Sequence, residues 1–438
     1  QFVMKICMFT NTYLPHVGGV ARSVSIVTRD LRQMGNHVLV IAPEYSDSNG
    51  RDENDLDILR VPAIQNFNGS DFSLRIPVPF IIDDTIDNFK PDVIHSHHPY
   101  LLGDAALRAA GRRRLPLIFT HHTRYEEYTH YVSANSDAMK QFAVHLSTEY
   151  ANMCTSVVAP SRSIARLIRE RGGITPVKEI PTGVDTGFFS KGQGKKFREE
   201  FGIPRDALVI GHLGRLAPEK NLLFLARAIS DSMADLPRLR FLVIGQGPSE
   251  DEIIRIFREK KLDDRLIMAG KQTGNRLRDA YHAMDLFVFA SKSETQGMVI
   301  TEAMAAGLPV IAIDAPGARE VVSNSKNGIL LPPDTSEYIF SETVRDAILS
   351  SQKLSRWGKA ALETAGRFDR KKCAEKLFRL YESVLADPKG YAGTENGYLK
   401  TWEKLLAAIR TEWDLVSEKA KAAIKIAGKD QKEGGFGE

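Results

Sequence analysis

The chain has 438 residues, of which 43% are hydrophobic and 26% are charged, and this length and composition predict two globular domains. Its formal net charge of +4 is small, which argues against a nucleic-acid partner, because such proteins usually carry a concentrated basic stripe. The three cysteines, Cys7, Cys154 and Cys373, lie far apart and favour a reducing compartment over a disulfide framework.

No apolar run reaches the 18 or so residues that a transmembrane helix needs. The first residues of the chain lack the basic and then apolar layout of a secretion signal. We therefore expect a cytoplasmic protein.

The first part of the chain alternates between buried strands and helices. An apolar run at residues 5–9 is followed by Gly18 and Gly19, by a helical pattern at about 20–34 and by a second apolar run at 38–41. Strand, glycine turn, helix and strand in this order are typical of a mononucleotide-binding βαβ unit. Further strand-like runs are at residues 93–95, 117–119 and 157–159. Because these runs are continuously apolar, they indicate a parallel sheet covered on both faces.

A second alternation of strands and helices begins after residues 183–195. Its strand-like runs are at residues 208–211, 242–244, 286–288 and 310–312. We therefore predict an α/β protein with two doubly wound, Rossmann-like domains facing a cleft, at residues 1–190 and 191–368. A helix at 369–388 is expected to cross back to the first domain. Apolar residues at helical spacing within 389–438 predict an amphipathic helical tail.

The most specific pattern in the sequence follows the strand at 286–288. Glu294 lies in a polar loop, and a helix is expected from about Gly297 onward. Gly297 allows a ligand to approach the backbone, and the free amides of Met298 and Val299 at the start of the helix suit a phosphate group. Glu302 lies one turn further, where its carboxylate can accept hydrogen bonds from sugar hydroxyls. The alternative is an ordinary turn with two surface glutamates.

A second pattern, Gly214-Arg215 followed by Lys220, lies where the strand at 208–211 turns into a helix. Arg215 and Lys220 can converge on a diphosphate and stabilise the charge that develops on it as a leaving group. The alternative is that both are solvated surface residues.

Together these residues resemble the Glu-x7-Glu signature of retaining glycosyltransferases with two Rossmann-like domains, the GT-B fold of family 4. This family includes sucrose synthases and phosphatidylinositol mannosyltransferases. The resemblance extends from Met4 to about Ala386. It implies that the first domain binds the acceptor and that the second binds a nucleotide-sugar donor, with no metal ion or other cofactor. Glu294 would then lie beside the donor sugar, and Glu302 would bind the ribose.

The resemblance also assigns roles to residues outside the glutamate pattern. The loop of Gly18 and Gly19 would face the donor phosphate, Gly270 and Lys271 would face the nucleobase, and His122 would lie beside the donor sugar. The catalytic set implied is Glu294, His122, Arg215 and Lys220. The donor-binding set implied is Gly18, Gly19, Gly214, Arg215, Lys220, Gly270, Lys271, Glu294, Gly297, Met298, Val299 and Glu302.

Retention of configuration leaves two mechanisms open. Glu294 could act as a covalent nucleophile, or the acceptor hydroxyl could attack on the face from which the diphosphate departs. The resemblance implies the second mechanism.

Histidines cluster in two loops, at His95-Ser96-His97-His98 and at His121-His122. Imidazoles at such spacing can bind zinc, so a metal-dependent hydrolase that uses His95, His97 and His98 is a remote alternative. No Asp or Cys ligand follows them in the sequence, and we predict no metal site.

Residues 120–132 closely resemble the matching stretch of diacylglycerol glucosyltransferases, which make membrane glycolipids from UDP-glucose. This resemblance implies transfer of glucose from UDP-glucose to a lipid such as diacylglycerol, at the inner membrane face, with His98, Tyr125 and Tyr128 as acceptor-binding residues. Arginines at residues 108–114 and 162–171 could meet anionic headgroups, although solvated helix faces are the alternative. The alternative function is transfer to a soluble or polysaccharide-precursor acceptor. The tail could pack on the first domain, pair two copies as a homodimer or lie on a membrane.

Overall fold

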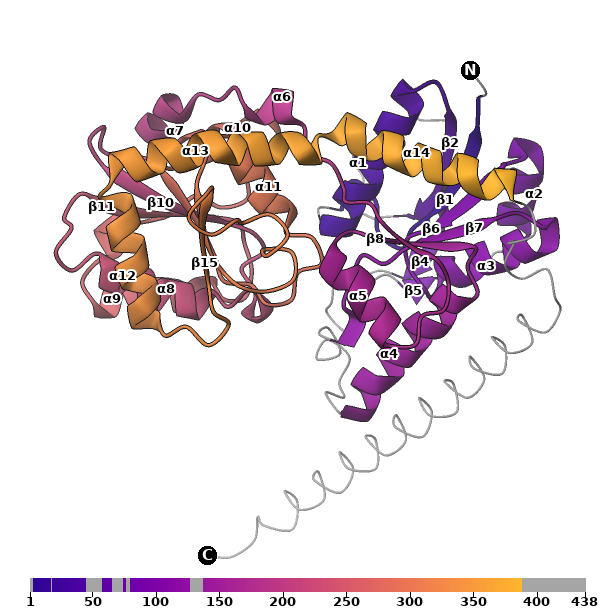
Figure 1. Cartoon of the computed structure of the whole chain (residues 1–438), viewed down its shortest axis with the longest axis horizontal. Coiled ribbons are helices and arrows are strands. Elements are labelled where there is room, and N and C mark those ends of the chain that lie inside the picture. Colours follow the sequence, from indigo (N-terminus) through magenta and orange to yellow (C-terminus); the bar gives the residue numbers. More distant parts are fainter. Residues whose placement is uncertain are drawn as a thin grey trace, which may run out of the picture.

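The computed structural model describes residues 3–16, 18–44, 57–64, 74–75, 79–126 and 137–387. Two α/β units lie side by side along the long axis of the molecule, each with a parallel sheet at its centre (Figure 1). The prediction of two doubly wound, Rossmann-like domains is therefore confirmed. The tail predicted at 389–438 lies outside the described residues. Within the described part of the chain, no helix is long and apolar enough to span a bilayer.

The first sheet has seven strands in the order β3-β2-β1-β6-β7-β8-β9, and every pairing is parallel. The strands are β1 (Lys5–Phe9), β2 (His37–Pro43), β3 (Ile58–Val61), β6 (Val93–Ser96), β7 (Leu117–Thr120), β8 (Ser156–Ala159) and β9 (Val177–Glu179). The helices that accompany it are α1 (Gly19–Gln33), α2 (Pro79–Phe89), α3 (Leu102–Arg113), α4 (Asp137–Asn152) and α5 (Arg162–Glu170). A separate antiparallel pair is formed by β4 (Ala63–Ile64) and β5 (Leu74–Arg75).

The first sheet is buried on both faces, as its continuously apolar strands require. One face packs against α2, α3 and α5. The other face packs against α1 and against α14 (Arg370–Ala386), whose Leu377 and Tyr381 belong to the same apolar cluster as Met8 and Val24. The last described helix of the chain therefore completes the core of the first domain.

The second sheet has six parallel strands in the order β12-β11-β10-β13-β14-β15. They are β10 (Leu208–Leu213), β11 (Leu239–Ile244), β12 (Leu266–Met268), β13 (Leu286–Phe289), β14 (Val310–Ile313) and β15 (Gly328–Leu331). The helices are α6 (Thr186–Phe189), α7 (Gly194–Glu200), α8 (Leu222–Ser232), α9 (Glu250–Glu259), α10 (Gly274–His282), α11 (Met298–Ala305), α12 (Glu337–Ile348) and α13 (Ser351–Ala365).

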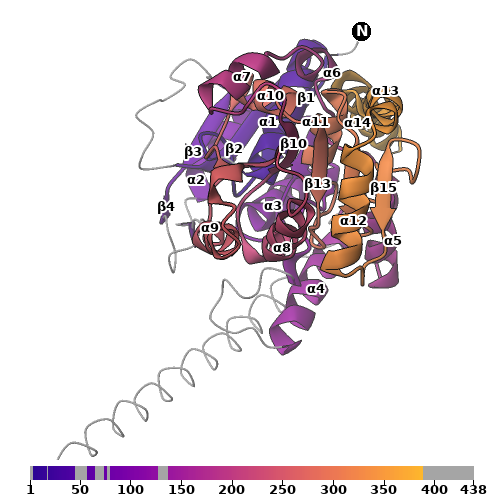
Figure 2. The ribbon, with the colours of Figure 1, turned by 90° about the vertical axis from the view of Figure 1, so that its left-hand side faces the viewer.

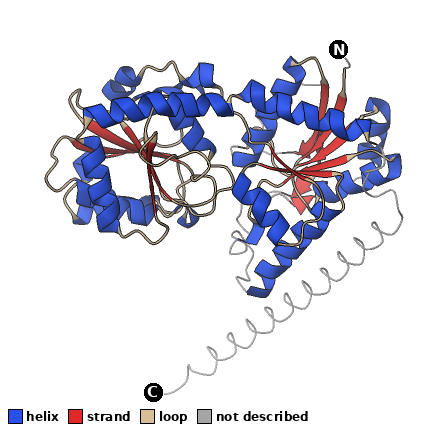
Figure 3. Cartoon of the chain, in the orientation of Figure 1, coloured by secondary structure: helices blue, strands red, loops and turns tan. Residues whose placement is uncertain are grey.

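Helices cover both faces of the second sheet as well (Figure 3). Helices α8, α9 and α12 pack on one face, and they lie close together in the view from the second domain (Figure 2). Helices α7, α10, α11 and α13 pack on the other face. The core of each domain thus lies between its own sheet and two layers of helices.

The chain crosses between the domains twice, and the two crossings lie side by side. The amide of Val184 donates to the carbonyl of Phe368 at 2.8 Å, and the amide of Arg370 donates back to Val184 at 3.0 Å. The Arg370 guanidinium also binds Asp185 at 3.1 Å and Asp30 of α1. Helices α13 and α14 run end to end across both domains at this point (Figure 1).

Gly183 is needed at this double crossing because a Cβ there would lie 2.1 Å from the Cα of Arg370. Gly183→Ala should force the two segments apart and lower the free energy of unfolding by about 1–3 kcal/mol, measured by denaturant titration. Gly187→Ala is the matched control, since the nearest heavy atom, on Asp185, lies 3.7 Å from the added Cβ. Equal losses in the two variants would contradict this account.

Candidate functional site

The loop that follows β13 is attached to the first domain. Its Thr295 hydroxyl donates to the carbonyl of His122 at 2.8 Å, and its Thr295 carbonyl accepts from the Ser161 hydroxyl at 2.6 Å. The guanidinium of Arg124 donates to the carbonyl of Lys292 at 3.1 Å. His122 and Ser161 follow β7 and β8, so the carboxyl ends of the two sheets meet at this loop.

A reciprocal pair of hydrogen bonds strengthens the same junction. The Gln296 side chain accepts from the amide of Thr182 at 2.7 Å and donates to its carbonyl at 2.6 Å. The Thr182 hydroxyl in turn lies 2.5 Å from the hydroxyl of Ser23 on α1. The sequence analysis did not identify these residues, because no local pattern marks a side-chain amide that pairs with a distant backbone.

Glu294 of this loop forms an ion pair with Lys220, which follows β10. The Lys220 ammonium lies 2.5 Å from one carboxylate oxygen of Glu294, which also accepts from the Ser291 hydroxyl at 3.2 Å. Burial alone would raise the pKa of Glu294, but the Lys220 charge and these hydrogen bonds hold it below the usual value of 4.5. The structure therefore brings together two of the predicted catalytic residues and keeps Glu294 anionic.

Helix α11 begins at Met298, one residue after the predicted start at about Gly297, which is its N-cap. Gly297 adopts a left-handed conformation with φ of +69°, which disfavours any side chain. The amides of Met298 and Val299 lie in the first turn, where no carbonyl of the same helix can accept from them. Gly317 packs beneath the loop, and a Cβ there would lie 2.8 Å from the Cβ of Glu294. Gly317 was not identified from the sequence, although its place in an Ala-Pro-Gly turn after β14 marks it as a candidate turn residue.

Glu302 is buried, with 2% of its surface exposed, and both of its carboxylate oxygens have partners. Arg22 of α1 binds one oxygen at 2.7 Å, and the Tyr281 hydroxyl donates to the other at 2.9 Å. Arg22 belongs to the first domain, so this ion pair also joins the two domains. A ligand hydroxyl that reaches Glu302 must displace or share one of these partners.

The glycine loop follows β1 and Arg215 follows β10, at the carboxyl ends of strands in the two sheets. Gly18 has an extended backbone and caps the start of α1, and Gly19 is the first residue of that helix. A Cβ on Gly19 would meet no atom within 4 Å, so a close approach by the protein itself does not explain this glycine. Arg215 follows β10 and is exposed, whereas Lys220 is half-buried.

The predicted nucleobase segment lies at the end of β11 and β12. The carbonyl of Gly270 accepts from the amide of Gly245 at 2.9 Å, and Gly270 has a left-handed φ of +65°. Gly214 donates to the carbonyl of Ile244 at 3.0 Å, which places the ends of β10 and β11 together. Lys271 is exposed.

The predicted acceptor residues have different surroundings. His98 is buried, and its Nδ1 accepts from the amide of Asn11, so it holds the loop after β1. Tyr125 is also buried against His121 and Tyr100, and its hydroxyl has no hydrogen-bond partner among the described residues. Tyr128 lies outside the described residues.

The clustered histidines do not converge as metal ligands. Both nitrogens of His95 are engaged, by the Tyr381 hydroxyl at 2.6 Å and the Thr120 hydroxyl at 2.7 Å. His97 instead pairs with His122 at 2.9 Å. Across the part of the chain that the structure describes, no group of three His, Cys, Asp or Glu side chains could hold a metal ion. This geometry gives no support to the metal-dependent hydrolase alternative.

Comparison with known proteins identifies the family. Residues 17–188 match the family described as Glycosyltransferase Family 4, and residues 193–364 match Glycosyl transferases group 1. An alpha-monoglucosyldiacylglycerol synthase of Acholeplasma laidlawii is 30% identical over 340 residues, covering 74% of this chain and 84% of the relative. The chain belongs to this glycosyltransferase family.

Other relatives of this glycosyltransferase differ in their named activities. A GDP-mannose-dependent alpha-mannosyltransferase of Mycolicibacterium smegmatis is 30% identical over 389 residues, covering 87% of this chain and 98% of the relative. The crystal structure of HepE from Anabaena in complex with UDP superposes with a TM-score of 0.72, covering 87% of this chain and 100% of HepE at 21% identity. This structural match supports the two-domain GT-B fold.

Five buried histidines and one half-buried histidine, His122, should make the stability of the glycosyltransferase depend on pH. Burial lowers the pKa of each below the usual value of 6.5, to about 3 for two of them and about 4 for two others; the six are His95, His97, His98, His121, His122 and His212. Below pH 6.5 the unfolded chain therefore binds protons that the folded chain does not, and the folded state loses stability. As the pH falls below 6.5, each histidine should lower the free energy of unfolding by up to about 1.4 kcal/mol per pH unit.

Denaturant titrations between pH 7 and pH 5 measure this loss. His121→Phe should reduce the slope by the contribution of one histidine, because His121 contacts the rings of Phe119 and Tyr125 and its Nδ1 has no partner among the described residues. Stability that stays constant over this pH range would contradict the prediction.

Proposed function

We propose that this glycosyltransferase transfers glucose, with retention of configuration, from UDP-glucose to a lipid acceptor such as diacylglycerol. The observation that carries the proposal is the Glu294–Lys220 ion pair, which lies directly before the open amides of α11. An anionic carboxylate and a helix N-terminus in one loop, with an ammonium from the segment after β10 bound to that carboxylate, suit a sugar diphosphate, which carries a polar ring on a charged leaving group.

In the proposed complex, the diphosphate binds at the amides of Met298 and Val299, with Lys220 and Arg215 as cations. Glu302 accepts hydrogen bonds from the ribose and exchanges its present partner, Arg22, for them. The exposed position of Arg215, which follows β10, is compatible with this role. The backbone near Gly270 faces the base.

The proposed reaction breaks the bond between the anomeric carbon and the diphosphate oxygen on one face of the sugar. The acceptor hydroxyl attacks on that same face, and its proton passes to the departing phosphate, so no protein base is required. Lys220 and the helix amides stabilise the charge that remains on UDP. Glu294, kept ionised by Lys220, supports the positive charge that develops on the ring. A covalent glycosyl intermediate on Glu294 is the alternative.

The lipid acceptor is supported by the similarity to the Acholeplasma laidlawii synthase, whose name states that it makes glucosyldiacylglycerol. A soluble acceptor is the second candidate. It is supported by a D-inositol 3-phosphate glycosyltransferase of Stackebrandtia nassauensis, which is 29% identical over 306 residues. The mannosyltransferase relatives likewise make GDP-mannose an alternative donor.

A screen of radiolabelled UDP-sugars and GDP-sugars against diacylglycerol in liposomes and against soluble acceptors tests the proposal. We expect labelled glucolipid from UDP-glucose. Glu294→Gln should lower turnover by about 100-fold or more, by analogy with other electrostatic groups in active sites, while UDP binding stays within a few-fold of the parent. Product from soluble acceptors alone would overturn the lipid assignment, and full turnover in Glu294→Gln would overturn the assigned site.

The two arginine clusters differ in how they could meet a membrane. On α3, Arg108 is paired with Asp104, and Arg112 and Arg113 are paired with Asp83. On α5, Arg166 and Arg169 are exposed on one side of the helix and form no ion pair with the described residues. We therefore assign contact with anionic headgroups to α5.

The double variant Arg166→Gln/Arg169→Gln should bind vesicles of anionic phosphatidylglycerol about 30-fold more weakly, at about 1 kcal/mol per residue. The double variant Arg112→Gln/Arg113→Gln changes the net charge equally, but these side chains are already neutralised by Asp83 and Asp87, so we expect a much smaller loss. Vesicle sedimentation at constant ionic strength measures both. Equal losses would contradict the assignment to α5.

A further inference from the structure

The imidazole rings of His95, His97 and His122 form a stack. The Nε2 of His122 is 2.9 Å from the Nδ1 of His97, and the rings of these two residues have centroids 5.1 Å apart. The carbonyl of His122 is bound by Thr295, so this histidine lies against the loop that carries Glu294. With its Nε2 occupied by His97, His122 has only its Nδ1 left to meet a substrate group.

His97 is itself held firmly. Its ring stacks on that of His95 with centroids 4.3 Å apart, and His95 is fixed at both nitrogens by the hydroxyls of Tyr381 and Thr120. Tyr381 belongs to α14, so the helix that completes the first domain also supports this stack. His97 therefore has little freedom to turn away from His122.

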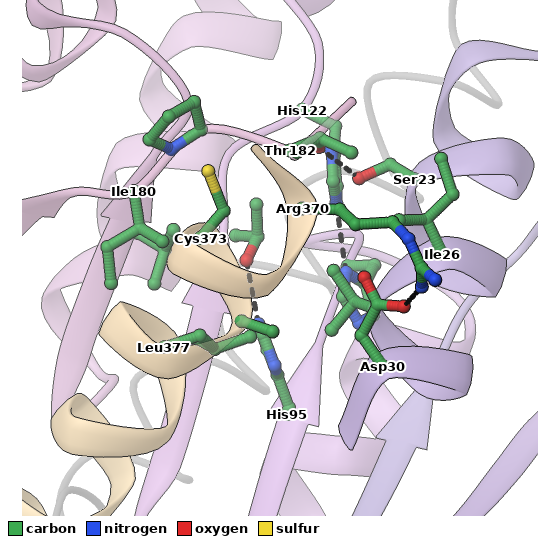
Figure 4. Close-up of a pocket in the computed structure, with 17 residues that line it drawn as sticks. Ser23, Ile26, Asp30, His95, His122, Ile180, Thr182, Arg370, Cys373 and Leu377 are labelled. Atoms are coloured by element: carbon green, nitrogen blue, oxygen red, sulfur yellow. Dashed lines mark hydrogen bonds and ion pairs between the residues drawn. The ribbon is translucent and has the colours of Figure 1, made fainter. Parts of the chain in front are cut away.

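The other nitrogen of His97, Nε2, is buried and has no hydrogen-bond partner among the described residues. His97 lines a cavity of about 30 Å³ to which Ser23, Thr182 and Arg370 also contribute (Figure 4). That volume has room for one or two water molecules, although most of its lining is apolar. A buried nitrogen without a protein partner is costly, and an apolar residue would fill the position at lower cost. Packing alone therefore does not explain why a histidine occupies position 97.

The pairing of His97 with His122 couples their protonation. Burial keeps the pKa of both rings well below the usual value of 6.5, so each ring is neutral and carries one hydrogen. The two facing nitrogens share a single hydrogen between them. Whichever nitrogen of His97 is protonated therefore decides whether the free Nδ1 of His122 donates or accepts a hydrogen bond.

We propose that His97 is a positioning residue that fixes the ring orientation and the tautomer of His122 for contact with the donor sugar. The sugar contact rests on the proposed function. The coupling between the two rings is a property of the folded chain alone, and it can be tested without a substrate.

Two substitutions separate the hydrogen bond from the packing. His97→Phe keeps a ring stacked between His95 and His122 but removes the nitrogen that faces His122. His97→Asn keeps an amide group near the position of Nδ1 and can hydrogen-bond to His122 in either tautomer. A merely structural role predicts that Phe is tolerated at least as well as Asn.

Nitrogen NMR of the full chain with ¹⁵N-labelled histidine reads the tautomer directly, and His122→Gln assigns the signal. We expect one tautomer of His122 in the parent and a mixture or the opposite tautomer in His97→Phe. A mixture in the parent, or no change in His97→Phe, would overturn the proposal.

The ratio of the affinity for UDP-glucose to that for UDP, measured by calorimetry, isolates the contribution of the sugar. We expect this ratio to fall about fivefold to tenfold in His97→Phe, as for the loss of one neutral hydrogen bond, and to recover in His97→Asn. An unchanged ratio would overturn the role at the sugar. If the parent binds neither ligand, the proposed function fails, and the NMR result still decides whether His97 controls His122.

Discussion

The attachment of the loop at 292–296 to the first domain is the interaction on which the whole site depends. This loop carries Glu294, and its backbone and side chains bind residues that follow β7 and β8. Two of these contacts bind main-chain carbonyls of the loop, so the side chains of Ser161 and Arg124 fix the backbone of the loop directly. Because both domains contribute, the arrangement of charges exists only when the two sheets face each other at this distance.

Two carboxylates near this loop are each balanced by a cation from a different part of the fold. Lys220, which balances Glu294, comes from the same domain, whereas Arg22, which balances Glu302, comes from the other. An ion in a partly buried position is costly unless a partner compensates it. The first pair can therefore persist when the domains separate, while the second must break. The two glutamates of one signature thus differ in their dependence on domain closure.

The sheets and the start of α11 could be predicted because their signals are local. Continuously apolar runs mark strands that are covered on both faces, and Gly297 marks a backbone conformation that other residues rarely adopt. The partners of Glu302 could not be predicted, since Arg22 lies 280 residues away and only the folded chain brings it near. The pairing of His97 with His122 could not be predicted either, since only the folded chain brings these two loops together. From the sequence, zinc binding remained a remote alternative for the histidine cluster, and the roles of His98 and His122 came only from the family resemblance, because spacing does not reveal which way an imidazole points.

The position of α14 has a consequence for how the chain folds during synthesis. Leu377 and Tyr381 fill the core beneath β1, yet they are made after the entire second domain. During synthesis, one apolar face of the amino-terminal sheet therefore stays partly uncovered until α14 has been made. The second domain is contiguous in the chain, so it can bury its own core before that. Domains usually mature in the order of their synthesis, but in this protein the carboxyl-terminal one can finish first.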